Sequence, residues 1–325
     1  MVQIYDMIVI GGGPAGYTAA LYAARAGLST LVLEKLSAGG QMALTAQIDN
    51  YPGFEGGIDG FTLGEKMQQS AERFGAVTEL AEVYKASLSG RIKTLDTSEG
   101  VFQGRTVVIA TGASPRILGV PDEEALAGKG VHYCAACDGA FYRGKTVAVV
   151  GGGNVAMDAA RCSKRLGAEV YVVYRRGMEE LPARHEEVEH AIEEGVIFKT
   201  LNNPIQINGD EQDCVKSMTC IEMELGEPDA SGRRRPVEKK GSEFDLPVDA
   251  VIMSLGTSPN PLIKSTTKGL EVNKKGGIIV NEEGLTSRQA VYAGGDAVTG
   301  AATVILAMGA GKLGAKSIDE YLSAK

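Results

Sequence analysis

The hydrophobic pattern of this chain repeats one arrangement twice. The segments "MIVIGGGPAGYTAALYAARAG" (Met7–Gly27) and "VAVVGGGNVAMDAARCSKRLG" (Val147–Gly167) each contain a short apolar run, a glycine-rich turn and an alanine-rich stretch. This order predicts a buried strand, a tight turn and a helix. The two copies start 140 residues apart. We therefore expect two similar units in a chain of 325 residues.

The glycine spacing within each copy predicts a nucleotide site. The first copy reads Gly-x-Gly-x-x-Gly and the second Gly-x-Gly-x-x-Ala. In such a fingerprint the first glycine makes the turn, the second lets the backbone approach a pyrophosphate, and the third position packs helix on strand. The phosphates then lie at the helix N-terminus. Two matches in this context predict two dinucleotide sites, formed by Gly11, Gly13, Pro14, Ala15 and Gly16, and by Gly151, Gly153, Asn154, Val155 and Ala156.

The charges about 20 residues after each fingerprint differ in sign. The first is followed by "STLVLEK", which places Glu34 at a strand end, where a carboxylate accepts a bond from a ribose 2′-OH and repels a 2′-phosphate. The second is followed by "EVYVVYRR", with Arg175 and Arg176 at the matching place, and guanidinium groups suit a 2′-phosphate. The alternative is that all three are ordinary exposed charges. We expect two different dinucleotides, the second being NADP(H).

Two more buried strands with tight turns complete the first domain. They are "VVIATGASPR" (Val107–Arg116) and "AVYAGGDAVTG" (Ala290–Gly300), and the second is similar to a motif of FAD-dependent reductases whose aspartate, Asp296 here, contacts the FAD ribityl–phosphate region. We therefore predict an α/β protein with two Rossmann-like dinucleotide-binding domains (three-layer ββα), the second inserted into the first. The FAD-binding domain would comprise 1–116 and 246–325, the NAD(P)H-binding domain 117–245, and the linkers Arg116–Pro121 and Gly241–Pro247.

A Cys-x-x-Cys pair, Cys134 and Cys137, lies just before the second fingerprint and is followed by Asp138. A structural zinc site needs four ligands, and the chain offers no second pair. Two inert buried thiols are a second alternative. A redox dithiol is favoured because two dinucleotide sites supply an electron source, and such a pair near a helix start has a lowered thiol pKa. Asp138 would transfer a proton to the leaving thiolate or cap a helix.

The remaining cysteines and histidines are interpreted as structural. Cys162 is expected to be buried on the helix after Gly153, and Cys214 and Cys220 are expected to pack beside a strand. His185 and His190 lie five positions apart on a helical segment, a spacing that does not place them on one face for a metal.

Composition excludes some classes of partner. Apolar content of 44% and charged content of 23% are those of a globular protein. The net charge of −8 and the lack of a long basic block speak against nucleic acid. No apolar run approaches the roughly 20 residues that span a bilayer, and the N-terminus lacks a signal-peptide pattern. We expect a soluble cytoplasmic protein without a membrane partner.

Several motifs together resemble the low-molecular-weight thioredoxin reductases over nearly the whole chain. They are "CAACDGAFYRGKTVAVVGGGN", "GPAGYTAALYAARAGL", "GGQM", "DNYPG", "ATGASPRILGVP" and the C-terminal "GD". The resemblance implies a homodimer that passes electrons from NADPH through FAD and the dithiol to thioredoxin or a thioredoxin-like protein. It makes Cys137 the thiol facing the flavin, Cys134 the one that attacks thioredoxin, and Asp138 the acid. It extends the FAD contacts to Gly40, Gln41, Asn50, Thr111, Gly112, Gly295 and the segment Ala302, Thr303 and Val304.

One block and the C-terminal segment depart from that family. Both resemble the glutamate synthase small subunit and ferredoxin–NADP transhydrogenase subunits. The block comprises "NVAMDAARCSKRLGAEVYVVYRRGMEELPARHEEVEHAIEEGV" and "ELGEPDASGRRRPV", and the C-terminal segment is "GDAVTGAATVILAMGAGKLGAKSIDEYL". Glu179 and Glu180 occupy the region of the family's third arginine, for which Arg184 is the candidate replacement.

Two further positions differ from the family pattern. Ala302-Thr303-Val304 replaces the family's Arg-Gln-Ala near the flavin ring, and Ala140 replaces the first of two phenylalanines that help to dock thioredoxin, while Phe141 is retained. The alternatives are the same dithiol enzyme with NADH or reduced ferredoxin as donor, or an electron-transfer flavoprotein subunit of a larger complex.

Overall fold

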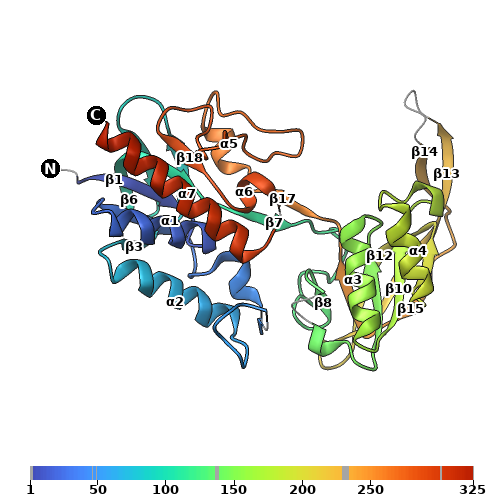
Figure 1. Cartoon of the computed structure of the whole chain (residues 1–325). Coiled ribbons are helices and arrows are strands. Elements are labelled where there is room, and N and C mark those ends of the chain that lie inside the picture. The colour runs from blue at the N-terminus through green and yellow to red at the C-terminus, as the bar shows by residue number, and fades with distance from the viewer. Residues whose placement is uncertain are drawn as a thin grey trace. The chain divides into compact units, whose positions relative to one another are not determined.

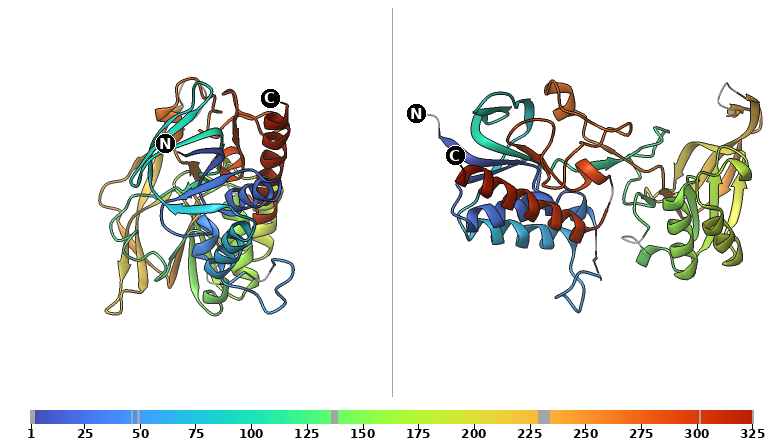
Figure 2. Two further views of the ribbon diagram at one scale, coloured as in Figure 1. Left: turned by 90° about the vertical axis from the view of Figure 1, so that its left-hand side faces the viewer. Right: turned by 45° about the horizontal axis from the view of Figure 1, so that its top comes forward.

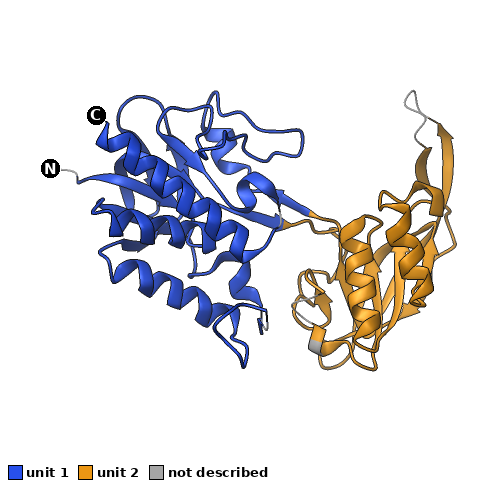
Figure 3. Ribbon diagram, in the orientation of Figure 1, with its two compact units in different colours: residues 1–114, 257–325 blue, residues 115–256 orange. Residues whose placement is uncertain are grey.

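The chain forms two compact units. A computed structural model describes residues 3–45, 47–48, 50–135, 139–228, 234–300 and 302–324. One unit comprises 1–114 with 257–325, and the other 115–256 (Figure 3). Each is built on a parallel sheet with helices packed on it (Figure 1), so the predicted α/β fold of two Rossmann-like domains is confirmed.

The first unit is built on a seven-stranded sheet in the order β3-β2-β1-β6-β5-β4, with β18 also paired to β6. Strands β1, β2, β3, β6 and β18 are parallel, and β4 and β5 add an antiparallel edge. The strands are β1 (Ile4–Ile10), β2 (Thr30–Glu34), β3 (Val77–Leu80), β4 (Val83–Ser87), β5 (Lys93–Thr97), β6 (Gly100–Ile109) and β18 (Val291–Ala293). The helices are α1 (Pro14–Arg25), η1 (Gly40–Leu44), α2 (Gly60–Glu72), α5 (Leu262–Thr266), α6 (Asp296–Thr299) and α7 (Val304–Ser323).

Alternation along the central strands gives this sheet two buried faces. On β1, Met7 and Val9 point into a core with the alanines of α1 and α7, whereas Ile8 and Ile10 point to the opposite face. Helices α1, α2 and α7 lie side by side on the first face in all views (Figures 1 and 2). Gly311 lets α7 pack closely on α1, because a Cβ at this position would collide with the Ala15 carbonyl.

The second unit has three layers. A parallel sheet in the order β11-β10-β9-β16-β8 has α3 and α4 on one face, and an antiparallel sheet of β12-β13-β14, with β15 paired to β13, packs on the other. The strands are β8 (Val131–His132), β9 (Thr146–Val150), β10 (Glu169–Tyr174), β11 (Ile197–Thr200), β12 (Asn202–Gly209), β13 (Val215–Pro228), β14 (Arg234–Glu238), β15 (Phe244–Pro247) and β16 (Ala250–Met253). The helices are η2 (Gly139–Phe141), α3 (Asn154–Arg165), η3 (Met178–Glu180) and α4 (His185–Glu193).

The chain returns to the first unit later than predicted. The crossing lies between Gly256 and Thr257, so neither the expected boundary at Leu246 nor the expected linker Gly241–Pro247 agrees with the structure. The reason is β16, which is buried between β9 and β8 and completes the parallel sheet of the second unit. The outgoing chain crosses between Ser114 and Pro115, close to the expected residue 116.

The two crossings of the chain are bonded to each other. Strand β7 (Ala113–Pro115) on the way out pairs with β17 (Thr257–Pro259) on the way back. Immediately beyond this ribbon, Arg116 N donates to Gly256 O at 2.9 Å. The inserted unit therefore leaves and rejoins the first through two adjacent backbones.

The expected burial of Cys162 and Cys214 is wrong. Both thiols are exposed, and only Cys220 is buried as predicted. Ser163, and not Cys162, takes the buried position on α3, and Cys214 lies in the turn before β13. None of the described helices combines the length and the apolar character that a membrane-spanning segment needs.

Candidate functional site

The first glycine turn requires glycine at two of its positions. Gly11 follows β1 with φ +103°, and a Cβ there would collide with the Ala110 carbonyl. A Cβ at Gly16 would collide with the Gly11 carbonyl. Gly13 is different, because nothing lies within 4 Å of its Cβ position and its φ is −81°. The turn is thus closed on the protein side and open at Gly13, in front of the α1 N-terminus, which no side chain caps.

This contrast gives a paired prediction. Gly16→Ala should lower the stability of the fold by about 1–3 kcal/mol, because the added methyl group meets backbone that has no room to move. Gly13→Ala should leave the melting temperature of the flavin-free protein unchanged and should weaken flavin retention. Thermal unfolding and the flavin absorbance of purified protein measure the two effects. Equal flavin binding by Gly13→Ala and wild type would contradict an approach of the pyrophosphate at this position.

The predicted acidic residue reaches this turn. Glu34 ends β2, and its Oε2 accepts from Gly12 N at 2.6 Å while Oε1 accepts from Leu36 N at 3.1 Å. Two backbone donors therefore hold the carboxylate in place, and its remaining lone pairs are available to a ribose hydroxyl. The first fingerprint and its acidic partner form one preorganised site.

The other residues predicted to contact FAD come together in this unit from separate segments. A Cβ at Gly40 would lie 3.4 Å from Gly13 Cα, one at Gly295 3.0 Å from Ala15 Cβ, and one at Gly11 3.3 Å from Thr111 Cα. Gly40 and Gln41 are exposed on η1, and Gly112 directly follows Thr111. Their contact with a cofactor stays a prediction.

Asp296 and the segment after it lie at the start of α6 and α7. Burial raises the pKa of the Asp296 carboxyl, and a backbone hydrogen bond from Ala302 opposes this shift. Thr303 is the N-cap of α7, where its hydroxyl accepts from Leu306 N at 3.3 Å. The side chain that replaces a family glutamine therefore serves to begin a helix.

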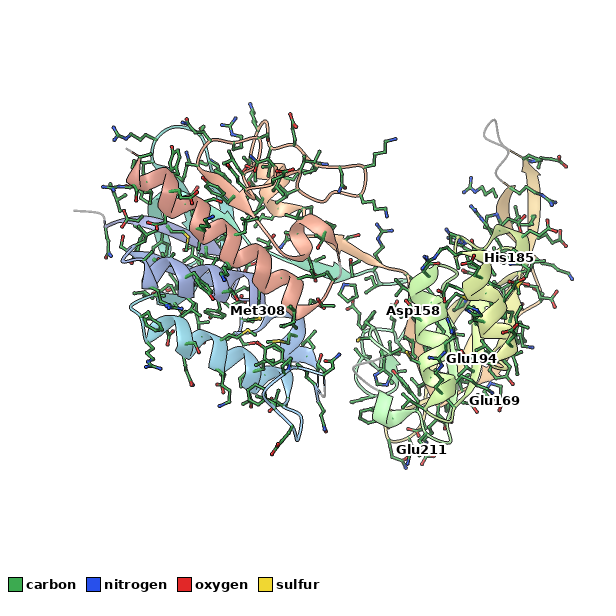
Figure 4. The ribbon with its side chains drawn as sticks, viewed as in Figure 1. Asp158, Glu169, His185, Glu194, Glu211 and Met308 are labelled. Atoms are coloured by element: carbon green, nitrogen blue, oxygen red, sulfur yellow. The ribbon has the colours of Figure 1, made fainter. Side chains whose placement is uncertain are left out.

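Sequence reasoning missed one contact that joins two of these segments. Tyr51, beside the predicted FAD residue Asn50, donates from its hydroxyl to Met308 Sδ on α7 at 3.4 Å. Figure 4 labels Met308 on that helix. Tyr51 and Val304 also pack against the same small cluster of Met42, Ile58 and Leu63. No local signal could have revealed this pair, because 257 residues separate its members.

The second glycine turn repeats the geometry of the first. Gly151 has φ +146°, and its Cβ would lie 2.5 Å from Ser254 O. Gly153 has nothing within 4 Å of its Cβ position, and Ala156 is fully buried against the sheet. Helix α3 then begins at Asn154 without a side-chain cap and without an acidic residue in its first turn. Its N-terminus is therefore suited to an anion.

Three arginines flank this turn. Arg175 and Arg176 follow β10; Arg175 is exposed, and the buried Nε of Arg176 has no hydrogen-bond partner among the described residues. Arg184 N donates to Asn154 Oδ1 at 2.9 Å, and the neighbouring Ala183 N donates to Gly152 O at 3.1 Å. Arg184 is thus anchored at the mouth of the turn, whereas Glu179 is exposed on η3.

Cys134 is half-buried and disulfide-bonded. Cys137 and Asp138 lie outside the described residues. The free cysteines of the described part are Cys162, Cys214 and Cys220, and burial raises the pKa of the Cys220 thiol to about 12, which keeps it protonated. No group of three or more potential metal ligands occurs in the described ranges.

Aromatic residues surround the segment that leads to Cys134. His132 is buried, with its ring 5.7 Å from that of Phe141 and 5.6 Å from that of Tyr142. Phe141 is itself 58% exposed. Phe141 therefore packs on the buried His132 ring and remains accessible at the surface.

Comparison with known proteins places this arrangement in a family. The model of the family described as pyridine nucleotide-disulphide oxidoreductase matches residues 5–311. The chain is 38% identical over 298 residues to thioredoxin reductase of Mycolicibacterium smegmatis, which covers 91% of this chain and 89% of that protein. It is 37% identical to the bifunctional thioredoxin reductase/thioredoxin of Mycobacterium leprae, over 91% of this chain and 60% of that longer protein.

A solved structure extends the agreement to three dimensions. The crystal structure of thioredoxin reductase from Streptococcus pyogenes MGAS5005 matches with a TM-score of 0.78 and 33% identity, covering 100% of both chains. The resemblance that the sequence indicates is thereby confirmed over nearly the whole length of the chain. The chain belongs to the pyridine nucleotide-disulphide oxidoreductases and, among them, to the thioredoxin reductases.

Proposed function

We propose that this protein is a thioredoxin-disulfide reductase that takes electrons from NADPH and delivers them through FAD and the Cys134–Cys137 dithiol to thioredoxin or a thioredoxin-like protein. The observation that carries the proposal is the disulfide at Cys134 in the same unit as the open turn at Gly153. An electron relay of this kind needs three parts: a disulfide, a site for NADPH and a site for FAD. The second unit offers the disulfide and one glycine turn, and the first unit offers the other glycine turn.

The two open turns support the assignment of cofactors. The turn at Gly13 faces the fixed carboxylate of Glu34, which suits a ribose without a 2′-phosphate, as in FAD. Arg175 and Arg176 follow the strand next to the turn at Gly153, and Arg184 is bonded to this turn through its backbone N–H, so three guanidinium groups are near enough in the fold to support NADPH as the second nucleotide. FAD, when bound, supplies a carrier that accepts a hydride and passes two electrons to a disulfide.

The chain's own residues then perform thiol–disulfide exchange. The Cys134 thiolate attacks one sulfur of the substrate disulfide, which forms a mixed disulfide and releases the other sulfur as a thiolate. Asp138 gives that leaving thiolate a proton. Cys137 next attacks Cys134 Sγ, restores the disulfide and releases the second substrate thiol. Two electrons pass from the dithiol to the substrate in each cycle.

Anaerobic titration tests this function. One equivalent of NADPH should bleach the flavin or reduce the disulfide, and excess NADPH should raise the thiol count by two per chain. NADH and reduced ferredoxin should require far higher concentrations. An unchanged thiol count after complete flavin reduction would instead indicate an electron-transfer flavoprotein subunit, and equal response to NADH would overturn NADPH as the donor.

The proposal includes the setting of the enzyme. We place it as a homodimer in the cytoplasm, acting on a protein disulfide and on neither nucleic acid nor membrane. The exposed free thiols of Cys162 and Cys214 support a reducing compartment, and the net charge of −8 is unfavourable for nucleic acid.

A further inference from the structure

Glu123 is a buried carboxylate with three hydrogen-bond donors. The residue is 1% exposed. Its Oε1 accepts from Leu118 N at 3.0 Å and from Tyr133 Oη at 3.2 Å, and its Oε2 accepts from Gly119 N at 2.7 Å. Nothing in the proposed electron path uses this group.

The donors come from two segments with different tasks. Leu118 and Gly119 follow the crossing at Ser114 and Pro115 by only a few residues. Tyr133 immediately precedes Cys134, which carries the disulfide. One carboxylate therefore bridges the chain crossing and the cysteine segment within the second unit.

The backbone beside Glu123 adopts an unfavourable conformation to place it there. Asp122 has φ +64°, a region that costs a non-glycine residue free energy, although aspartate tolerates it better than most. Its carbonyl accepts from Leu126 N at 3.0 Å, and Leu126 is buried in the core under the sheet. The turn at Asp122 is therefore anchored to the core through Leu126, and the Glu123 side chain next to it is buried.

The returning crossing is bonded to the same segment. His132 pairs with Ile252 on β16, and β16 leads directly to the crossing after Gly256. The cysteine segment is thus connected to the outgoing crossing through Glu123 and to the returning one through the sheet. Among the contacts of the described residues, the connection to the outgoing segment includes one side-chain hydrogen bond, from Tyr133 to Glu123.

The choice of a carboxylate at this place is informative. Burying a charge costs free energy that an apolar side chain of similar size avoids, so packing alone does not account for it. Burial, and then the charge of Glu123, raise the pKa of Tyr133 to about 12. The Tyr133 hydroxyl therefore keeps its proton at physiological pH and can donate the hydrogen bond to Glu123.

We propose that Glu123 is a positioning residue that couples the state of the Cys134 disulfide to the outgoing chain crossing, acting through Tyr133. This inference rests on the proposed function, because it requires a disulfide that opens and closes. When two electrons and two protons convert the disulfide to a dithiol, the backbone at Cys134 relaxes and the Tyr133 hydroxyl moves off Glu123. The carboxylate then holds Leu118 and Gly119 less firmly, and the crossing gains freedom in the reduced state.

Amide hydrogen exchange at Leu118 and Gly119 tests the coupling. The FAD-loaded protein would be measured without oxygen, as isolated and after reduction by dithiothreitol, with thiols counted in both samples. We expect exchange about tenfold faster in the reduced wild type, the size of one lost hydrogen bond to a charged group. Tyr133→Phe should exchange at one common rate in both states. Tyr171→Phe is the matched control, because Tyr171 also donates to a carboxylate in the same unit, that of Glu169 at 2.8 Å. Figure 4 labels Glu169.

Linkage adds a second readout, the reduction potential of the disulfide. A bond made only in the disulfide state favours that state, so Tyr133→Phe should raise the potential by about 30 mV for a tenfold coupling, whereas Tyr171→Phe should leave it unchanged. If Tyr133→Phe fails to fold, Glu123→Gln replaces it, with fast exchange expected in both states. Equal exchange in oxidised and reduced wild type, once two new thiols are counted, would overturn the coupling. No new thiols would overturn the proposed function instead.

Discussion

Replacing Cys137 by serine is expected to leave NADPH able to bleach the flavin and to abolish the reduction of thioredoxin. A serine hydroxyl forms no disulfide with Cys134, so the relay has no state that stores two electrons as sulfur bonds. We expect turnover with thioredoxin to fall by roughly a thousandfold or more, which corresponds to about 4 kcal/mol in the transition-state barrier. Stopped-flow absorbance of the flavin and a coupled thioredoxin assay measure the two half-reactions separately.

Cys162→Ser is the control for this experiment. Cys162 is an exposed, free cysteine of the second unit. It should retain wild-type turnover, which would show that loss of a thiol does not by itself inactivate the enzyme. Thioredoxin reduction by Cys137→Ser at a wild-type rate would disprove the dithiol relay.

The second large effect concerns the choice of nucleotide. Arg176→Ala and Arg184→Ala should each raise the KM for NADPH about 10- to 100-fold and leave the KM for NADH within about twofold. A charge-assisted hydrogen bond to a phosphate contributes about 1.5–3 kcal/mol, and only NADPH carries the 2′-phosphate. Arg184→Lys should recover a small part of the loss, since an ammonium lacks the planar fork of a guanidinium.

Arg165→Ala is the matched control for the arginine variants. Arg165 lies at the far end of α3 and pairs with Glu194, away from the turn that begins the helix. Its removal should not change either KM. Steady-state kinetics of flavin reduction with both nucleotides give the comparison. A proportional rise in both KM values for Arg184→Ala would mean that Arg184 maintains the local backbone at Ala183 and Arg184 and does not recognise the 2′-phosphate.

The parts of the fold that could be predicted are those that local chemistry dictates. Gly11, Gly16 and Gly151 have no room for a Cβ, so the spacing of the glycines identifies the turns directly. Glu34 follows from the length of one strand–helix–strand unit. These features depend on residues close in sequence, and such features are readable from a chain alone.

The parts that were missed depend on distant residues. Strand β16 belongs to the second unit because it pairs with β9 and β8. The sequence "DAVIM" predicts a buried strand but does not indicate which of the two sheets the strand joins. The sequence names Arg184 only as a candidate, because the bond that holds its backbone N–H at the second turn is made by Asn154, thirty residues earlier. Cys162 was expected in the core because cysteine behaves as a small apolar residue. On an amphipathic helix such a residue is also compatible with the boundary between the buried and the exposed face. Glu123 is a different case, because its partners lie only 4 to 10 residues away. It was missed because the run Asp122, Glu123 and Glu124 does not show which of its carboxyl groups becomes buried.

The adjacent ends of the inserted unit have an evolutionary consequence. Arg116 and Gly256 are hydrogen-bonded to each other, and β7 pairs with β17. The two ends of the insert therefore lie side by side, whatever the size of the insert. Domain insertion is tolerated best where the ends of the insert lie together. The whole cassette could therefore be exchanged between flavoenzymes without rebuilding its recipient. Recombination at this ribbon would join a nucleotide-binding block of one lineage to a flavin scaffold of another.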